Sequence, residues 1–248
     1  MSFVEKYILE PLRYTTSDWL KVVIGGLLLF FNLTLDWTLS LLLGPFSIIP
    51  TIIIDLVVSI VIMGYYIGVI KNTLEGLDIL PDWSNIGEIL IDGALCVGAL
   101  LILLLVIYLP LILLLVAVGN LSFPWIMVVF FYILVYILVS LIALMIYTPL
   151  ATVNLVKKGF FGFFDFEEVF KKISPEYLGI IALYTLWDIG IVVVFYLMAT
   201  ISLFVFFLIL PLGILCFLLS TLVISVINFG LWIMFFRAIA KYCLEKES

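Results

Sequence analysis

Long apolar runs separated by short polar segments dominate the chain. The runs Ala94–Val118, Trp125–Leu150 and Tyr177–Leu210 each exceed the roughly 20 apolar residues that a helix needs to cross a bilayer. Backbone amides in lipid must be hydrogen-bonded internally, which leaves helices or a closed barrel. Because the runs lack the alternation of barrel strands, the pattern predicts an all-α, polytopic membrane helix bundle, with residues 1–248 as a single integral membrane domain.

Hydropathy predicts about six spans, arranged as three hairpins. Short turns rich in glycine and proline close the first two hairpins at residues 44–47 and 119–124. The third turn is weakly marked, and Pro211 is either a kink inside the last span or its start. The expected spans are Trp19–Leu43, Ile48–Val69, Ala94–Ala117, Trp125–Leu150, Leu178–Ser202 and Leu208–Ile239.

The charges orient this arrangement. All 11 lysines and arginines precede or open the first span, follow the second or fourth span, or end the chain, while the three opposite turns contain none. Positive residues beside short loops stay in the cytoplasm, so we expect a multi-pass protein of the cell membrane with both termini cytoplasmic. The acidic balance, 17 carboxylates against 11 cations, gives no indication of a nucleic-acid partner. The expected surroundings are bilayer lipid, with a membrane or cytoplasmic protein as a further possible partner.

A weak internal repeat has an offset of 83 residues. Gly76 corresponds to Gly159, and Asp82 to Asp165. The chain therefore divides into units at about 18–81, 82–164 and 165–248, each an acidic-aromatic helix start followed by a hairpin. We expect short cytoplasmic interfacial helices that begin at Asp82 and Asp165, each capped by its aspartate. The aromatic residues at these starts are interface anchors or a partner-binding surface: Trp19, Trp83 and Phe166.

Several of these segments resemble a known family. The stretch Leu12–Leu27, the Gly64-Tyr65-Tyr66 triplet and the Leu80-Pro81-Asp82-Trp83 motif are similar to domain-of-unknown-function family 4013. That family consists of prokaryotic, largely archaeal, polytopic membrane proteins without an assigned activity. The resemblance covers roughly residues 10–110 well and the remainder through hydropathy and loop placement. It implies the architecture and supplies no catalytic or binding residues.

Catalytic and metal-binding motifs are missing from the sequence. There is no histidine, which removes the commonest general base and metal ligand. Cys96, Cys216 and Cys243 have no metal or redox spacing. Phosphate-binding glycine loops and intramembrane protease signatures are absent as well. We therefore expect no enzyme activity, no catalytic residue, no metal and no cofactor.

Carboxylates at membrane depth are the candidate site residues. Asp188 lies about eleven residues into the fifth expected span, roughly 16 Å along the helix and near mid-bilayer. An ionised aspartate there costs about 2.5–3.5 kcal/mol, so it forms a proton- or cation-coupled site, or it is a neutral carboxyl hydrogen-bonded to Asn228. Asp55 and Asp36 lie near the outer ends of adjacent spans, as solvated rim residues or as an outward-facing cation site.

Three polar residues recur at the cytoplasmic ends of the descending spans. Lys71, Asn154 and Arg237 are spaced by 83 residues and form either a polar ring for an anionic group or side chains that snorkel to the surface. The leading hypothesis is transport of a small solute or ion, or lipid handling, through the bundle. The alternative is a membrane scaffold or accessory subunit that recruits a partner through its cytoplasmic amphipathic loops.

Overall fold

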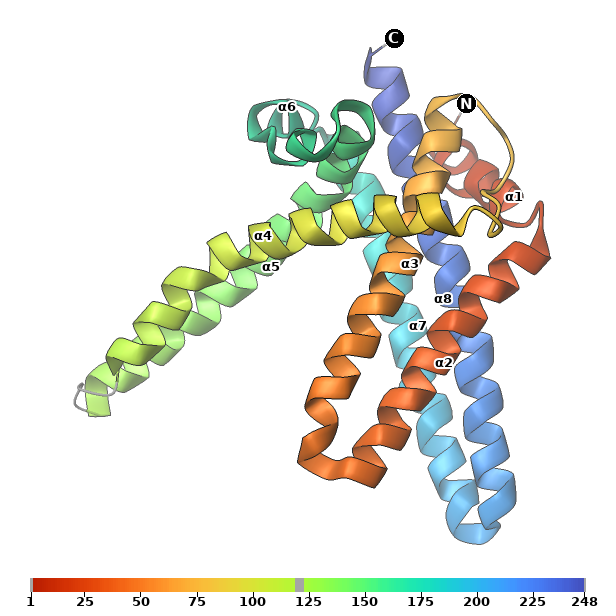
Figure 1. The fold of residues 1–248 in the computed structure, drawn as a ribbon, viewed down its shortest axis with the longest axis vertical. Helices are drawn as coiled ribbons and strands as arrows, with labels where there is room; N and C mark the ends of the chain where they lie inside the picture. Colours follow the sequence, from red (N-terminus) through yellow and green to blue (C-terminus); the bar gives the residue numbers. More distant parts are fainter. Residues whose placement is uncertain (1, 119–122, 248) are drawn as a thin grey trace.

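The structure, a computed structural model, describes residues 2–118 and 123–247, and within these ranges every regular element is a helix (Figure 1). Short helical turns connect or precede the long helices: η1 (Glu5–Leu9), α1 (Glu10–Thr15), η2 (Gly44–Ser47), η3 (Phe160–Phe164) and α6 (Phe166–Lys171). The long helices are α2 (Trp19–Leu43), α3 (Ile48–Leu74), α4 (Ile86–Val118), α5 (Phe123–Lys158), α7 (Pro175–Leu208) and α8 (Leu210–Glu247).

Five segments of the described chain are long and apolar enough to cross a membrane, which makes this a multi-pass membrane protein. The first, Trp19–Leu74, contains both α2 and α3. The chain reverses between these two helices at Gly44, whose φ of 54° is a conformation that favours glycine. Large apolar side chains cover the outer surface, such as Leu41 at 83% exposed and Phe207 at 78%. Such a surface requires lipid as its solvent.

The helices diverge from a common end that holds both termini (Figure 1). Helix α8 is the centre of the bundle, because α1, α2, α3, α5 and α7 all pack against it. The α2–α3 and α7–α8 hairpins extend to the opposite end, whereas the α4–α5 hairpin leans away from them. The largest fully buried side chains gather where the helices meet near the termini: Arg237, Tyr7, Tyr65, Tyr177, Tyr242 and Phe163.

Glycines set the two closest helix crossings. A Cβ atom added at Gly64 of α3 would lie 1.8 Å from the Ile89 carbonyl oxygen of α4, and one added at Gly93 would lie 1.8 Å from the Ile60 carbonyl oxygen. The α3 and α4 backbones are therefore in direct contact, which only glycine permits. Gly25 of α2 meets the Phe229 ring of α8 in the same way.

The helices agree with the expected spans at some ends and exceed them at others. Helix α2 occupies the predicted Trp19–Leu43. Pro211 marks the start of the last helix, because the chain breaks at Ile209, with φ −143° and ψ 97°, and α8 begins at Leu210. At 1.5 Å per residue, the 38 residues of α8 are about 57 Å long. This exceeds the roughly 30 Å hydrocarbon core, so α8 extends well beyond it.

Of the two interfacial helices expected from the loops, one is present. The Asp165 carboxylate accepts a hydrogen bond from the Glu168 amide at 3.2 Å and caps α6, as predicted. The prediction of a helix that begins at Asp82 is wrong. The Asp82 carboxylate instead accepts from the Ser84 amide at 2.9 Å and closes a turn. The following helix begins at Ile86 and continues without a break into the apolar run, so α4 includes the segment expected to lie along the membrane surface.

Because α3 and α4 cross closely, the effect of an added side chain on stability should depend strongly on its position. Gly64→Val places methyl groups against the Ile89 backbone and should lower stability by at least about 3 kcal/mol, the upper end for overpacking. Gly98→Val makes the same change on α4 at a glycine with open space around it and controls for helix propensity. Thermal unfolding in detergent, followed by size-exclusion chromatography, measures both. Equal melting temperatures would contradict the crossing.

Candidate ligand cavity

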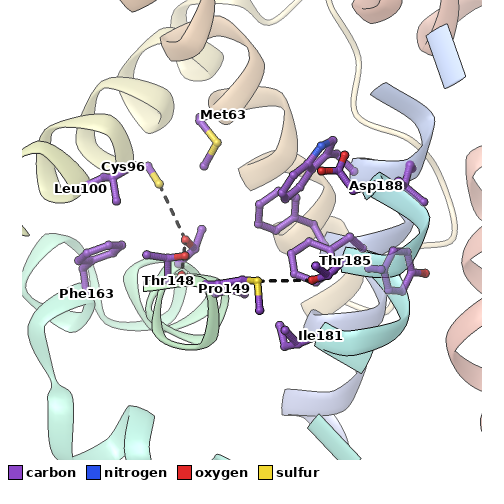
Figure 2. A pocket seen from close by; sticks show the side chains of 16 residues that line it. Met63, Cys96, Leu100, Thr148, Pro149, Phe163, Ile181, Thr185 and Asp188 are labelled. Atoms are coloured by element: carbon purple, nitrogen blue, oxygen red, sulfur yellow. Dashed lines mark hydrogen bonds between the residues drawn. The ribbon is translucent and has the colours of Figure 1, made fainter. Parts of the chain in front are cut away.

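A cavity of about 380 Å³ lies between the α4–α5 hairpin and the α7–α8 hairpin (Figure 2). Met63 of α3 and Phe163 of η3 complete its walls. Most of the sixteen lining side chains are apolar, and Asp188 is the one carboxylate among them. The lining residues are Met63, Cys96, Leu100, Met145, Thr148, Pro149, Thr152, Phe163, Ile181, Tyr184, Thr185, Asp188, Leu231, Trp232, Phe235 and Phe236.

Asp188 lies at one side of this cavity on α7, across from Cys96 and Phe163 (Figure 2). Its Oδ1 atom accepts a hydrogen bond from Asn228 Nδ2 of α8 at 3.4 Å, which is long for such a bond. The pairing with Asn228 is the one that the sequence suggested. Because the bond is long and the carboxylate borders a cavity, Asp188 retains the capacity to accept a stronger hydrogen bond from a ligand.

Helix α7 extends beyond the expected fifth span at both ends, which changes the position of Asp188 along it. Asp188 lies thirteen residues after Pro175, at the start of α7, and twenty residues before Leu208, at its end. At 1.5 Å per residue these separations are about 20 and 30 Å. The expected span began at Leu178 and ended at Ser202, which placed the carboxylate near its middle. In the full helix, Asp188 is closer to the end that carries the termini.

Three of the four hydroxyl groups on residues that line the cavity donate to partners within the protein. Tyr184 donates to the Tyr7 carbonyl oxygen at 2.8 Å, and Thr152 donates to the carbonyl oxygen of Thr148, one turn earlier, at 2.8 Å. Thr185 donates to the Met145 sulfur at 3.4 Å. The walls therefore present methyl groups, aromatic rings and sulfur to the interior, and Asp188 is their strongest hydrogen-bond acceptor.

The proline in α5 adds a second acceptor near the cavity. Pro149 has no backbone N–H, so it cannot donate to the carbonyl oxygen of Met145, four residues earlier. Both residues line the cavity. Thr148-Pro149 on α5 and Thr185-x-x-Asp188 on α7 thus contribute to one site. The sequence analysis missed the threonines and Tyr184, and the short spacing of Thr185 and Asp188 on one helix face is the signal that was available.

A polar corner closes the cavity toward the end of the bundle with the termini. The Tyr147 hydroxyl donates to the Phe163 carbonyl oxygen at 2.5 Å, which ties η3 to α5. Beyond η3, Lys158 forms ion pairs with Asp165, at 2.9 Å, and with Glu168. Hydrogen bonds from Lys158, and then from Lys172, lower the pKa of the Glu168 carboxyl. The corner that covers the cavity is therefore held by charges that are present at neutral pH.

The residues of the expected polar ring each have partners within the protein. Lys71 forms ion pairs with Glu88 and Asp92, at 2.9 and 2.6 Å. Asn154 is fully buried, and its Oδ1 atom accepts from Lys172 at 2.9 Å. In both cases the partner belongs to the following repeat unit. Neither side chain extends freely toward solvent.

Arg237, the third member, is 2% exposed and joins three parts of the chain. Its guanidinium donates to Glu10 of α1 at 2.9 Å, to Asp78 in the loop after α3, and to the Thr73 hydroxyl at 3.1 Å. The Tyr14 ring lies 4.2 Å from its central carbon. Arg237 therefore fixes the N-terminal segment and the α3–α4 loop to α8, and it is not available for an external anion.

Asp36 of α2 and Asp55 of α3 lie on two helices that pack against each other. Asn32 donates to Asp55 at 2.8 Å, while one Asp36 oxygen is buried without a hydrogen-bond partner among the described residues. Asp36 lies seven residues before the end of α2 at Leu43, and Asp55 lies seven residues after the start of α3 at Ile48, so they are equally far from the turn. This cluster is separate from the cavity at Asp188, which none of its members lines.

The three expected anchor residues differ in their surroundings. Trp83 stacks on Tyr65 with ring centres 4.2 Å apart and donates through Nε1 to the Lys21 carbonyl oxygen at 3.0 Å. Phe166 stacks on Tyr147 at 5.1 Å and remains 46% exposed. Trp19 is 59% exposed. Trp83 therefore belongs to the helix packing, and Trp19 is the most exposed of the three.

The described residues contain no group of three or more cysteine, aspartate or glutamate side chains placed to hold a metal ion. Cys96 lies 4.0 Å from the Thr152 hydroxyl, and none of the three cysteines forms a disulfide. The cavity at Asp188 is thus the place in the described chain where an acceptor group, a hollow of ligand size and several helices meet.

Comparison with known proteins gives the chain its relatives. A sequence model of the family described as "Protein of unknown function (DUF4013)" matches residues 46–203. Two uncharacterized proteins of Methanocaldococcus jannaschii, MJ1189 and MJ0233, are each 31% identical to the chain, and each match covers 72% of the chain and 72% of the relative. No solved structure matches. The matched region begins after the Leu12–Leu27 motif and reaches to the last third of α7, so it contains Asp188.

The buried position of Arg237 predicts a large stability effect. Arg237→Met removes the cation from Glu10 and Asp78 and should cost about 3 kcal/mol, the lower end for breaking a buried pair, because Asp78 retains contact with water. Lys171→Ala breaks the exposed Lys171–Glu167 pair and should cost less than about 1 kcal/mol. Thermal unfolding of the two purified variants makes the comparison. Similar small losses in both would show that Arg237 does not hold the N-terminal segment.

Proposed function

We propose, starting from the fact that this chain belongs to the DUF4013 family of proteins of unknown function, that it binds and transports a hydrophobic solute with a cationic or hydrogen-bond-donating group. The observation that carries the proposal is Asp188 at the side of an otherwise apolar cavity. The role is non-enzymatic and requires no cofactor.

The shape and lining of the cavity support this class of solute. A volume of about 380 Å³ falls in the range of small-molecule sites. Apolar walls favour the hydrophobic body of a ligand, while a carboxylate in such surroundings requires a proton or a positively charged partner. A small inorganic ion would leave most of the apolar wall unoccupied, and a wholly apolar molecule would leave Asp188 without a partner. An amphiphilic solute satisfies both parts.

The proposed placement in the cell membrane has six spans, one for each long helix, with both termini in the cytoplasm. It is supported by the lysines and arginines, all of which lie in segments at the end of the bundle that carries the termini. In this orientation Asp188 lies in the cytoplasmic half of the bilayer. The cavity also lies between hairpins that diverge from each other (Figure 1), so a change in their angle would open or close it. Such rocking of hairpins is a common route for transport.

A pair of matched ligands tests the role of Asp188. The protein in lipid nanodiscs should bind 4-phenylbutylamine at least about tenfold more tightly than the neutral alcohol 4-phenylbutanol, because a hydrogen bond to a charged group contributes about 1.5–3 kcal/mol. Asp188→Asn should remove this preference and leave the binding of the alcohol unchanged. Isothermal titration calorimetry measures both dissociation constants.

Asp55→Asn is the control, since it makes the same change at a carboxylate outside the cavity. It should retain the preference for the amine. Amine binding that is equally tight in the wild type and in Asp188→Asn would remove Asp188 from the site. In reconstituted vesicles, amine uptake by Asp188→Asn should be slower than uptake by Asp55→Asn.

A membrane scaffold that recruits a partner is the second candidate. It is favoured by the exposed rings on the corner formed by η3 and α6, where Phe161 is 83% and Phe170 60% exposed. Trp83 does not belong to such a surface, because it is packed against Tyr65. A stoichiometric partner that copurifies with the wild type and is lost in a Phe161→Ser/Phe170→Ser double variant would support recruitment. A protein that purifies alone from its native membrane would oppose it.

A further inference from the structure

A second hollow, of about 610 Å³, lies on the other side of α7 from the Asp188 cavity. Its walls are the α1–α2 corner and the middle of α7, and α8 forms its floor. Trp187 lines this groove, whereas the next residue, Asp188, lines the cavity, and Leu231 of α8 borders both. The lining residues are Leu12, Thr15, Thr16, Trp19, Val22, Trp187, Gly190, Ile191, Val194, Ile224, Val226, Ile227, Gly230, Leu231 and Met234.

The groove is a built recess and not a shallow furrow between helices. Val22 and Thr15 are 1% and 4% exposed, yet both line it. The opposite wall includes Gly190, where an added Cβ atom would meet nothing within 4 Å. A small residue on one wall and buried residues on the other leave a channel for a slender apolar chain.

Thr15 belongs to the buried wall of this groove. The Thr15 hydroxyl oxygen is inaccessible to solvent and has no hydrogen-bond partner among the described residues. Its methyl carbon lies against Gly230, since a Cβ atom built there would be 3.5 Å from it. Thr15 therefore contributes to the groove through packing against α8 and not as a hydrogen-bonding group for a bound molecule.

An unneutralised cation lies next to the same wall. Arg13 is exposed, and no carboxylate among the described residues lies within ion-pair distance of it. Other cations near the termini are paired, such as Lys6 with Glu176 at 3.3 Å and Lys241 with Glu10 at 2.6 Å. Thr16, which lines the groove, lies three residues after Arg13, and residues at this spacing are neighbours on a helix surface. The positive charge therefore stands beside the end of the groove that Thr15 and Thr16 form.

From this arrangement we propose that the groove is a specific site for a membrane lipid with an anionic phosphate headgroup. One hydrocarbon chain of the lipid occupies the groove between α2 and α7. The phosphate of the headgroup pairs with Arg13. Exposed Trp19, at the start of α2, lies where a headgroup region would be. This lipid site does not depend on the function proposed for Asp188. It binds a negatively charged group, whereas the Asp188 site favours a positively charged one.

Lipid binding by the delipidated protein tests the site. Native mass spectrometry in detergent gives apparent dissociation constants for phosphatidylglycerol and phosphatidylcholine with identical chains. The wild type should prefer phosphatidylglycerol by about fivefold, the factor expected for one arginine beside a headgroup of net negative charge, because the choline cation offsets the phosphate charge in phosphatidylcholine. Arg13→Gln should abolish the preference by weakening phosphatidylglycerol binding more than phosphatidylcholine binding. Equal affinity of the wild type for both lipids, or an undiminished preference in Arg13→Gln, would overturn the headgroup assignment.

A steric plug tests the groove itself. Gly190→Leu extends a side chain into the open space of the groove and should weaken the binding of both lipids by about tenfold or more. Gly98→Leu is the matched control at another glycine with open surroundings and should bind as the wild type does. If Gly190→Leu does not fold, Ile227→Trp supplies the plug, because Ile227 lines the groove and is 53% exposed. A folded plug variant that binds like Gly98→Leu would place the lipid elsewhere.

Discussion

The backbone contact between α3 and α4 determines the shape of the whole bundle. Gly64 and Gly93 allow the two helices to cross with no side chain between them. Beyond this crossing α4 departs from α3, and the α4–α5 hairpin leans away from α7–α8 (Figure 1). The space that opens between the two hairpins near the crossing is the cavity that Asp188 borders. A larger residue at either glycine would separate the helices and change that angle.

The polar end of the bundle complements this apolar crossing. Lys71, Asn154 and Arg237 each pair with a residue of another repeat unit: Lys71 with Asp92, Asn154 with Lys172, and Arg237 with Asp78. In lipid, where apolar contact between helices provides little driving force, such polar contacts and close packing hold helices together. These contacts fix the helices at one end, while their opposite ends are free to diverge.

Much of the fold could be predicted because lipid imposes strong rules on sequence. The apolar runs and the glycine-proline turn indicated α2 and α3, and the aspartate cap of α6 followed from its spacing. The full length of α8 was not predicted, because its last turns carry charged residues and are buried by tertiary contacts, with the N-terminal segment through Arg237 and Glu10 and with the segment before α7 through Tyr242. The start of α4 was predicted wrongly because an aspartate at such a position can either cap a helix or close a turn, and Asp82 closes a turn.

The candidate site was only partly predictable for a physical reason. Asp188 and Asn228 stand out in apolar helices, so their pairing could be proposed from sequence. Leucine or methionine has the same hydropathy whether it faces lipid or a cavity, so the walls around Asp188 carry no such signal. They depend on the angle between hairpins, which is set by glycine contacts far away in the sequence.

The most direct measurement of the central claim is an experimental structure of the protein in lipid nanodiscs with a brominated phenylbutylamine bound. The account predicts bromine density between α5 and α7 and an amine nitrogen about 2.8 Å from the Asp188 carboxylate. Helix α5 packed directly against α7 with no space between them, or ligand density away from Asp188, would contradict it.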